Sequence, residues 1–149
     1  TVSFSYYLFR AAARLDAYEK VWPRLKTWYD MLDTGTSTWF EQPEPTRSDC
    51  HAWSSWILRD FFTEIAGIQP LEPGYRKVLV QPRMVGGLDH ASAALPTPAG
   101  MVEAAWRRNA NGSVTVEATL PDGCAGGEVR VGGQSQSLQP GAGTCHFEV

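Results

Sequence analysis

The sequence changes character near residue 69, and this change constrains the fold more than any other feature. Fourteen of the seventeen aromatic residues precede it, whereas twelve of the fourteen glycines and seven of the ten prolines follow it. Apolar residues recur with a helical period in the first part and with a two-residue period in the second. We therefore predict an α+β chain in two parts, an aromatic-rich helical piece over residues 1–69 and a β piece over residues 70–149.

Three helices are predicted in the first part: residues 2–15, residues 16–33 and a third that ends at Gly67. The apolar face of the first consists of Phe4, Leu8, Ala12 and Leu15. Pro23 predicts either a kink in the second helix or a true start near it. Burying a large aromatic side chain is worth roughly 1.5–3 kcal/mol, and three helices are too few to bury fourteen of them. Since the chain also opens inside a helical pattern without an initiator methionine, we expect further helices upstream in a longer polypeptide.

The second part shows short runs of alternating apolar residues. They lie at residues 78–80, 102–106, 114–120, 129–131 and 145–149. Turn sequences such as Asn111-Gly112 and Gly132-Gly133 separate several of these runs. An antiparallel β-sandwich is the simplest arrangement of such strands.

Charge excludes two classes of partner. The net charge of -3 provides no basic stripe for nucleic acid and no polybasic segment for an anionic membrane. The longest apolar stretch is shorter than the ~18 residues that suggest a membrane span. His51, His90 and His146 lack the spacing of metal ligands, so neither a metal site nor another cofactor is predicted.

The three cysteines, an odd number without a Cys-x-x-Cys spacing, slightly favour a reducing compartment. A cytoplasmic location is therefore slightly favoured over secretion. Cys124 and Cys145 both fall in the β part, where they can pair only if their strands are neighbours. The sequence leaves that pairing open.

The densest group of reactive and aromatic residues lies at the junction of residues 38–56. Glu41 follows Trp39 and Phe40, which can supply apolar walls, and His51 is expected in the first turn of the third helix. Inverting glycoside hydrolysis needs a carboxylate that activates water, and partial desolvation tunes the pKa of such a group. From the residues alone, Glu41 is a candidate base or a solvated loop glutamate.

The other polar and aromatic residues of the junction also have two interpretations. His51 can donate a hydrogen bond to a sugar hydroxyl or be satisfied by neighbouring backbone. Trp39 can stack on a pyranose ring, whereas helix packing is favoured for Trp53 and Trp56. Asp49 is interpreted as a cap of the third helix rather than as a second catalytic carboxylate.

Several motifs carry a resemblance to a known family. They are Thr38-Trp39-Phe40-Glu41, Ser48-Asp49-Cys50-His51-Ala52-Trp53, Gly67-Ile68, Glu72-Pro73-Gly74-Tyr75 and Pro96-Thr97-Pro98. Together they resemble the C-terminal part of bacterial α-L-rhamnosidases of glycoside hydrolase family seventy-eight. The resemblance covers nearly the whole chain, and the Ser-Asp-Cys-His-Ala-Trp run is its most specific piece.

The resemblance implies the last helices of an (α/α)6 toroid followed by a C-terminal antiparallel β-sandwich. It implies an inverting enzyme that removes terminal α-L-rhamnosyl residues from glycosides or oligosaccharides, with Glu41 as general base and with His51 and Trp39 in the substrate site. No other carboxylate matches the motif of the general acid, which is expected in upstream domains of the same polypeptide. The isolated chain is therefore expected to be inactive.

Two alternatives stay open from the sequence. The β part can be a carbohydrate-binding or purely structural domain; a binding role would need an exposed aromatic platform. The complete protein can also be a helical-toroid hydrolase that acts on another sugar.

Overall fold

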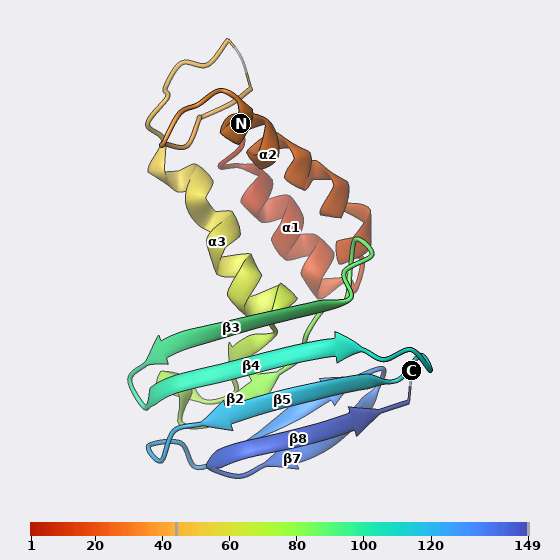
Figure 1. Ribbon diagram of the computed structural model, residues 1–149. Helices are drawn as coiled ribbons and strands as arrows, with labels where there is room; N and C mark the ends of the chain where they lie inside the picture. The colour runs from red at the N-terminus through yellow and green to blue at the C-terminus, as the bar shows by residue number, and fades with distance from the viewer. Residues whose placement is uncertain (44, 149) are drawn as a thin grey trace. The chain divides into compact units, whose positions relative to one another are not determined.

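The computed structural model describes residues 1–43 and 45–148 (Figure 1). The chain forms two compact units, Thr1–Asp60 and a second that begins at Phe61. The first contains helices and a long loop, and the second contains both sheets. The structural division thus falls shortly before the change in composition near residue 69.

The first unit contains two longer helices and several short helical segments. In chain order they are α1 (Ser5–Arg14), η1 (Tyr18–Lys20), η2 (Trp22–Leu25), α2 (Lys26–Asp33), η3 (Ala52–Trp56) and α3 (Ile57–Asp60). Pro23 lies in the first turn of η2, and α2 begins only after it. The predicted break at Pro23 is therefore confirmed. The third predicted helix is a composite of a 3-10 turn, an α turn and a π turn, η4 (Phe61–Ile65).

The core of the helical unit is built from aromatic rings. Phe9 makes edge-to-face contacts with Tyr18, Trp28 and Trp56, at centroid distances of 5.5, 6.3 and 4.8 Å. These contacts select the buried side of α1. Of the predicted apolar face, only Ala12 is buried within this chain, whereas Phe4, Leu8 and Leu15 are exposed.

A buried carboxylate ties three segments of the helical unit together. Asp60, at the end of α3, accepts a hydrogen bond from the Tyr18 hydroxyl at 2.7 Å. It also pairs with Arg10 of α1, and with Arg59 at 3.2 Å. A buried charge needs such partners, because an uncompensated charge in the interior is costly.

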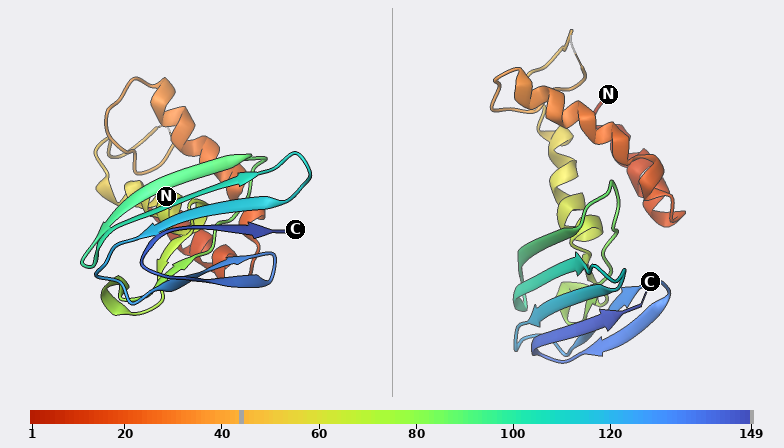
Figure 2. Two further views of the ribbon diagram at one scale, coloured as in Figure 1. Left: turned by 60° about the horizontal axis from the view of Figure 1, so that its bottom comes forward. Right: turned by 45° about the vertical axis from the view of Figure 1, so that its right-hand side comes forward.

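The second unit is a two-layered β structure (Figures 1 and 2). Its strands are β1 (Ile68–Pro70), β2 (Val78–Val80), β3 (His90–Thr97), β4 (Gly100–Arg108), β5 (Val114–Leu120), β6 (Gly127–Val131), β7 (Gln134–Leu138) and β8 (Gly141–Phe147), with a 3-10 turn η5 (Pro73–Tyr75) before β2. One sheet has the order β1-β2-β6-β7 and the other β3-β4-β5-β8. The predicted β-sandwich is thus confirmed as two antiparallel-rich sheets.

The pairing departs from the prediction at one place. β2 and β6 run parallel, with Val78 opposite Gly127 and Val80 opposite Val129, whereas the other described pairs are antiparallel. A parallel pair needs a long crossover, and here the whole of β3, β4 and β5 lies between the two strands in the sequence.

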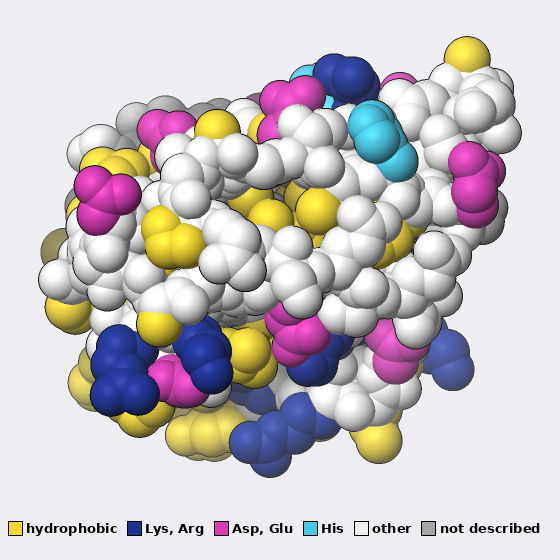
Figure 3. Space-filling view, turned by 90° about the horizontal axis from the view of Figure 1, so that it is seen from below, with side chains coloured by type: hydrophobic (Ala, Val, Ile, Leu, Met, Phe, Trp, Pro, Cys, Tyr) yellow, Lys and Arg dark blue, Asp and Glu magenta, His cyan; other side chains and the backbone are white. Residues whose placement is uncertain are grey.

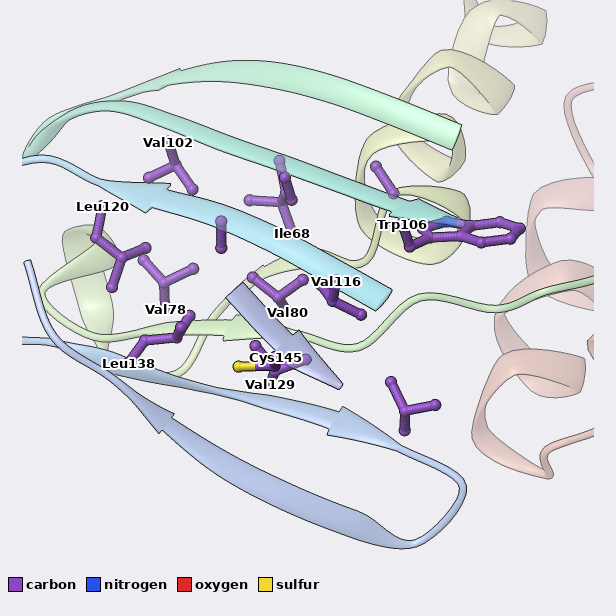
Figure 4. Close-up of a cluster of buried hydrophobic side chains, with 14 of the residues drawn as sticks. Ile68, Val78, Val80, Val102, Trp106, Val116, Leu120, Val129, Leu138 and Cys145 are labelled. Atoms are coloured by element: carbon purple, nitrogen blue, oxygen red, sulfur yellow. The ribbon is translucent and has the colours of Figure 1, made fainter. Parts of the chain in front are cut away.

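The core of the β unit lies between its sheets (Figure 4). Val102, Val116 and Val129 are fully buried among its side chains. Trp106 joins this core, and its indole N–H donates to the Ile65 carbonyl at 2.7 Å. Cys124 and Cys145 are both buried free thiols, so the pairing that the sequence left open is not formed.

The surface of the chain does not point to a particular class of binding partner. On the face that Figure 3 shows, acidic side chains are interspersed with basic ones. Within the described ranges, no helix is both long and apolar enough to cross a membrane. The same residues contain no group of three or more acidic, histidine or cysteine side chains placed to hold a metal ion.

Candidate functional site

Two stretches of the junction run beside each other in the helical unit. The Glu41 N–H donates to the Ser48 carbonyl at 2.9 Å, and the His51 N–H donates to the Trp39 carbonyl at 2.6 Å. The Thr38 hydroxyl bonds the Asp49 carbonyl as well. These bonds close the loop by pairing residues 38–41 with residues 48–51. This paired segment, the loop frame, holds both Glu41 and His51, which are ten positions apart in the sequence.

Both the backbone and the side chain of Glu41 are held by hydrogen bonds. Its carbonyl accepts the Val2 N–H at 2.8 Å, which ties the loop to the start of the chain. Its side chain is only 10% exposed and forms an ion pair with Arg47. The Arg47 Nε donates to one carboxylate oxygen at 3.1 Å, and Nη2 donates to the other.

The electrostatics keep this carboxylate ionised. The hydrogen bond from Arg47 lowers the pKa of Glu41 below its ordinary value. Burial acts in the opposite direction, while the charges of Arg47 and His51 lower the pKa further. Glu41 is therefore ionised at neutral pH, as an ordinary glutamate is, and this is the form that a general base requires, although the lowered pKa also reduces its affinity for a proton.

His51 lies directly before η3, as the residue that precedes its first turn, rather than within it. The ring is half-buried and stands edge-to-face against Trp53, with centroids 5.3 Å apart. The side chain of His51 makes no capping bond to η3. The imidazole nitrogens are therefore not committed to the end of that helix.

The junction tryptophans differ in their environment. Trp39 is half-buried. Trp56 packs against Trp28 at 5.1 Å and donates its indole N–H to the Val2 carbonyl at 3.1 Å, as a packing residue should. Trp53 does not pack as predicted within this chain, because its side chain is 77% exposed.

Trp53 lines a pocket of about 350 Å³, to which Trp56 also contributes. The other lining residues are Ser3, Phe4, Tyr6 and Tyr7. Asp49, predicted to cap the third helix, is exposed and does not cap it, since His51 occupies the position before η3.

Sequence reasoning missed Arg47. An arginine six residues after a glutamate, in a loop with two prolines, carries no recognisable spacing signal. Its partnership with Glu41 depends on closure of the loop by backbone hydrogen bonds. The exposure of the Trp53 ring could not be predicted, because helical periodicity does not show which turns of a helix have no neighbouring element packed on them.

Comparison with known proteins identifies the β unit. A family model described as the bacterial alpha-L-rhamnosidase C-terminal domain matches residues 67–141, which is half of the chain. The chain belongs to this family. An alpha-L-rhamnosidase of Alteromonas sp. (strain LOR) is 28% identical to this rhamnosidase C-terminal chain in a 104-residue alignment that covers 60% of the chain and 11% of the relative.

Solved rhamnosidase structures share the fold of the chain. The alpha-L-rhamnosidase of Dictyoglumus thermophilum matches 99% of the chain with a TM-score of 0.84 and 21% identity. The enzyme of Aspergillus terreus matches 94% with a TM-score of 0.80 and 21% identity. A Streptomyces avermitilis enzyme, solved in complex with L-rhamnose, gives 0.73 at 20% identity over 94% of the chain. The chain spans about a tenth of the curated relative and about a fifth of these structures.

Proposed function

We propose that this chain is the C-terminal part of an inverting α-L-rhamnosidase, with residues 1–69 as the last helices of an (α/α)6 catalytic barrel and residues 70–149 as a C-terminal β-sandwich domain. Membership of the rhamnosidase C-terminal family supports the enzyme class. The exposed apolar side chains of the helical unit support a larger helical array, since Phe4, Tyr7 and Leu15 are more than half exposed.

Glu41 is the general base of the proposed reaction. Inversion requires the base to take a proton from water while the water oxygen bonds to the anomeric carbon. As this bond forms, the glycosidic bond breaks on the opposite face, and its oxygen takes a proton from a carboxylic acid outside this chain. The observation that carries this assignment is the sheltered, ionised Glu41 carboxylate on the loop frame that also holds His51.

His51 and Trp39 are the substrate contacts of the proposal. His51 has a half-buried ring beside Trp53 and is free of a helix-capping duty, so it can donate to a sugar hydroxyl. Trp39 adjoins the base in sequence and retains part of its face for the apolar side of a pyranose. The substrate class is a terminal α-L-rhamnosyl glycoside or oligosaccharide.

The decisive experiment replaces Glu41 by glutamine in the complete enzyme. Glu41→Gln keeps the shape of the side chain and removes the proton acceptor, so kcat on an aryl α-L-rhamnoside should fall by about a hundredfold or more. Glu72→Gln is the matched control, because Glu72 also pairs with two cations and has a lowered pKa, caused first by its hydrogen bond from Lys77. The control variant should keep the kcat of the parent.

Near-normal turnover by Glu41→Gln would remove Glu41 from the mechanism. A panel of aryl glycosides tested on the parent enzyme checks the sugar specificity. Faster turnover of another glycoside than of the rhamnoside would contradict the proposed substrate but leave the proposed role of Glu41 as base unaffected.

For the β unit alone we propose a structural rather than a carbohydrate-binding role. Its three aromatic residues after position 69 are Tyr75, Trp106 and Phe147. Trp106 and Phe147 are buried, and Tyr75 packs against the same core. No flat aromatic platform is thus left exposed in the described part of this unit after residue 69.

A further inference from the structure

The loop that presents Glu41 also fixes the position of Arg47. The backbone bond between Glu41 and Ser48 brings the residue before Ser48 close to the carboxylate. The Thr46 hydroxyl donates to the Ser48 carbonyl at 2.9 Å and accepts the Ser48 N–H at 3.2 Å, which shapes the chain on either side of Arg47. The position of the Arg47 Cα, from which the side chain extends, is therefore fixed by these loop hydrogen bonds.

The Arg47 guanidinium covers the carboxylate on its solvent side. The Arg47 side chain is 72% exposed, whereas that of Glu41 is 10% exposed. Each of two guanidinium nitrogens donates to a different carboxylate oxygen, an arrangement that fixes the plane of the acceptor as well as its distance.

This contact leaves room for a water molecule. An ionised carboxylate offers about four lone-pair sites. The two bonds from Arg47 use one site on each oxygen. The second site on each oxygen can still accept a hydrogen bond from water, so the pair need not open before a proton is transferred.

We propose that Arg47 is a positioning residue that holds the Glu41 carboxylate in one orientation, with a lone pair left for the attacking water. This inference rests on the proposed role of Glu41 as base. The opposite role is a plug that blocks the carboxylate until substrate displaces it. A positioning residue raises turnover when present, whereas a plug lowers it.

The charged groups that face Glu41 decide the pH behaviour. They are Arg47, whose hydrogen bond has the largest effect, and His51, both of which lower the pKa of Glu41. Since a lowered pKa keeps the base ionised down to a lower pH, removal of Arg47 should raise that pKa. The acidic limb of kcat/KM, which reports the base in the free enzyme, should then move to higher pH.

The test compares Arg47→Met, Arg47→Lys and a matched control in the complete enzyme. Arg76→Met is the control, because Arg76 is 76% exposed and pairs with Glu72. Arg47→Met should lower kcat on an aryl α-L-rhamnoside about ten- to a hundredfold, leave KM little changed and shift the acidic limb upward. Arg47→Lys keeps the charge without the two-point contact and should give intermediate kcat. Arg76→Met should behave as the parent.

An unchanged or increased kcat in a folded Arg47→Met enzyme, with an unshifted acidic limb, would overturn the positioning role. If thermal melting shows that Arg47→Met does not fold, the test rests on Arg47→Lys. A kcat and a pH profile equal to those of the parent in that variant would also overturn the positioning role of Arg47. Glu41→Gln is measured alongside. An active Glu41→Gln enzyme removes the proposed base itself, whereas an inactive Glu41→Gln with a normal Arg47 series removes only the role of Arg47.

Discussion

At the scale of single residues, the three cysteines differ in environment. Cys50 is exposed in the junction loop, whereas Cys124 and Cys145 are buried in the β core. The Cys124 thiol also donates to the Tyr75 carbonyl at 3.1 Å. Burial raises the pKa of both core thiols, because a thiolate is disfavoured where water is excluded.

A thiol-labelling experiment checks these environments. At pH 8 a water-soluble maleimide should modify Cys50 rapidly, since the thiolate is the reactive form. Cys124 and Cys145 should react only in denaturant, because their raised pKa values reduce the thiolate fraction below pH 9 and their burial blocks access. Mass spectrometry of native and urea-treated samples reads the result. Equal rates for all three in the native protein would contradict the buried positions.

Residue identity predicted part of the candidate site and missed the rest for a physical reason. Glu41, His51 and Trp39 could be singled out because their chemistry and their neighbours are readable in the sequence. Arg47 could not, because its bonds to Glu41 form only after the backbone closes the loop. The role of Glu41 is a prediction that the Glu41→Gln variant tests, and the roles of His51 and Trp39 stay predictions.

At the scale of elements, the parallel pairing of β2 with β6 depends on a glycine. A Cβ built on Gly127 would lie 2.1 Å from the Val78 carbonyl oxygen, closer than any real contact. Because this neighbour is backbone, it can move only if the strands separate. Gly143 in β8 offers the comparison, since its Cβ would meet only the end of the Leu138 side chain, at 3.4 Å.

Gly127→Ala should therefore destabilise the β unit by about 2 kcal/mol or more, within the range of backbone clashes in cores. Gly143→Ala should change the free energy of unfolding by less than about 1 kcal/mol. Urea unfolding followed by Trp106 fluorescence in a chain of residues 61–149 measures both. Equal midpoints for the two variants would show that the β2 to β6 contact tolerates separation.

The strands that the sequence predicted are those with large alternating side chains. β4 and β5 carry valines and Trp106 on their inner face, so their period is visible. β3 was missed because its alternation uses alanine and serine, which differ little in hydropathy. β7 was missed because four of its five residues are polar and its place at the end of a sheet allows this. Only Ala12 of the predicted apolar face of α1 is buried within this chain, because periodicity does not say which neighbour covers a helix face.

At the scale of the whole molecule, the chain carries one proposed catalytic group and much exposed apolar surface. The helical unit leaves large side chains open to solvent, among them Leu15 at 77%, Leu32 at 69% and Trp53 at 77%. Among the exposed apolar residues, Phe4, Tyr7 and Trp53 line one pocket, and a large exposed apolar patch marks a binding face. In the proposal, the rest of the catalytic barrel covers it.

The 149-residue chain alone should not hydrolyse an aryl α-L-rhamnoside, because a base without the partner acid supplies only half of the inverting pair. A spectrophotometric assay of the chain beside the complete enzyme measures this. Turnover that is lost in Glu41→Gln but present in the isolated wild-type chain would show that the proposed acid is not required.

The order β1-β2-β6-β7 has a consequence for synthesis of the protein. Val80 leaves the ribosome before Gly127, and forty-six residues lie between them. At roughly 5–20 residues per second, β2 waits about 2–10 s for its parallel partner. During that interval its open edge presents unpaired backbone N–H and C=O groups. Because β1 pairs with the opposite edge of β2, it cannot cover this one, and the nascent chain is open there to pairing with another polypeptide until β6 arrives.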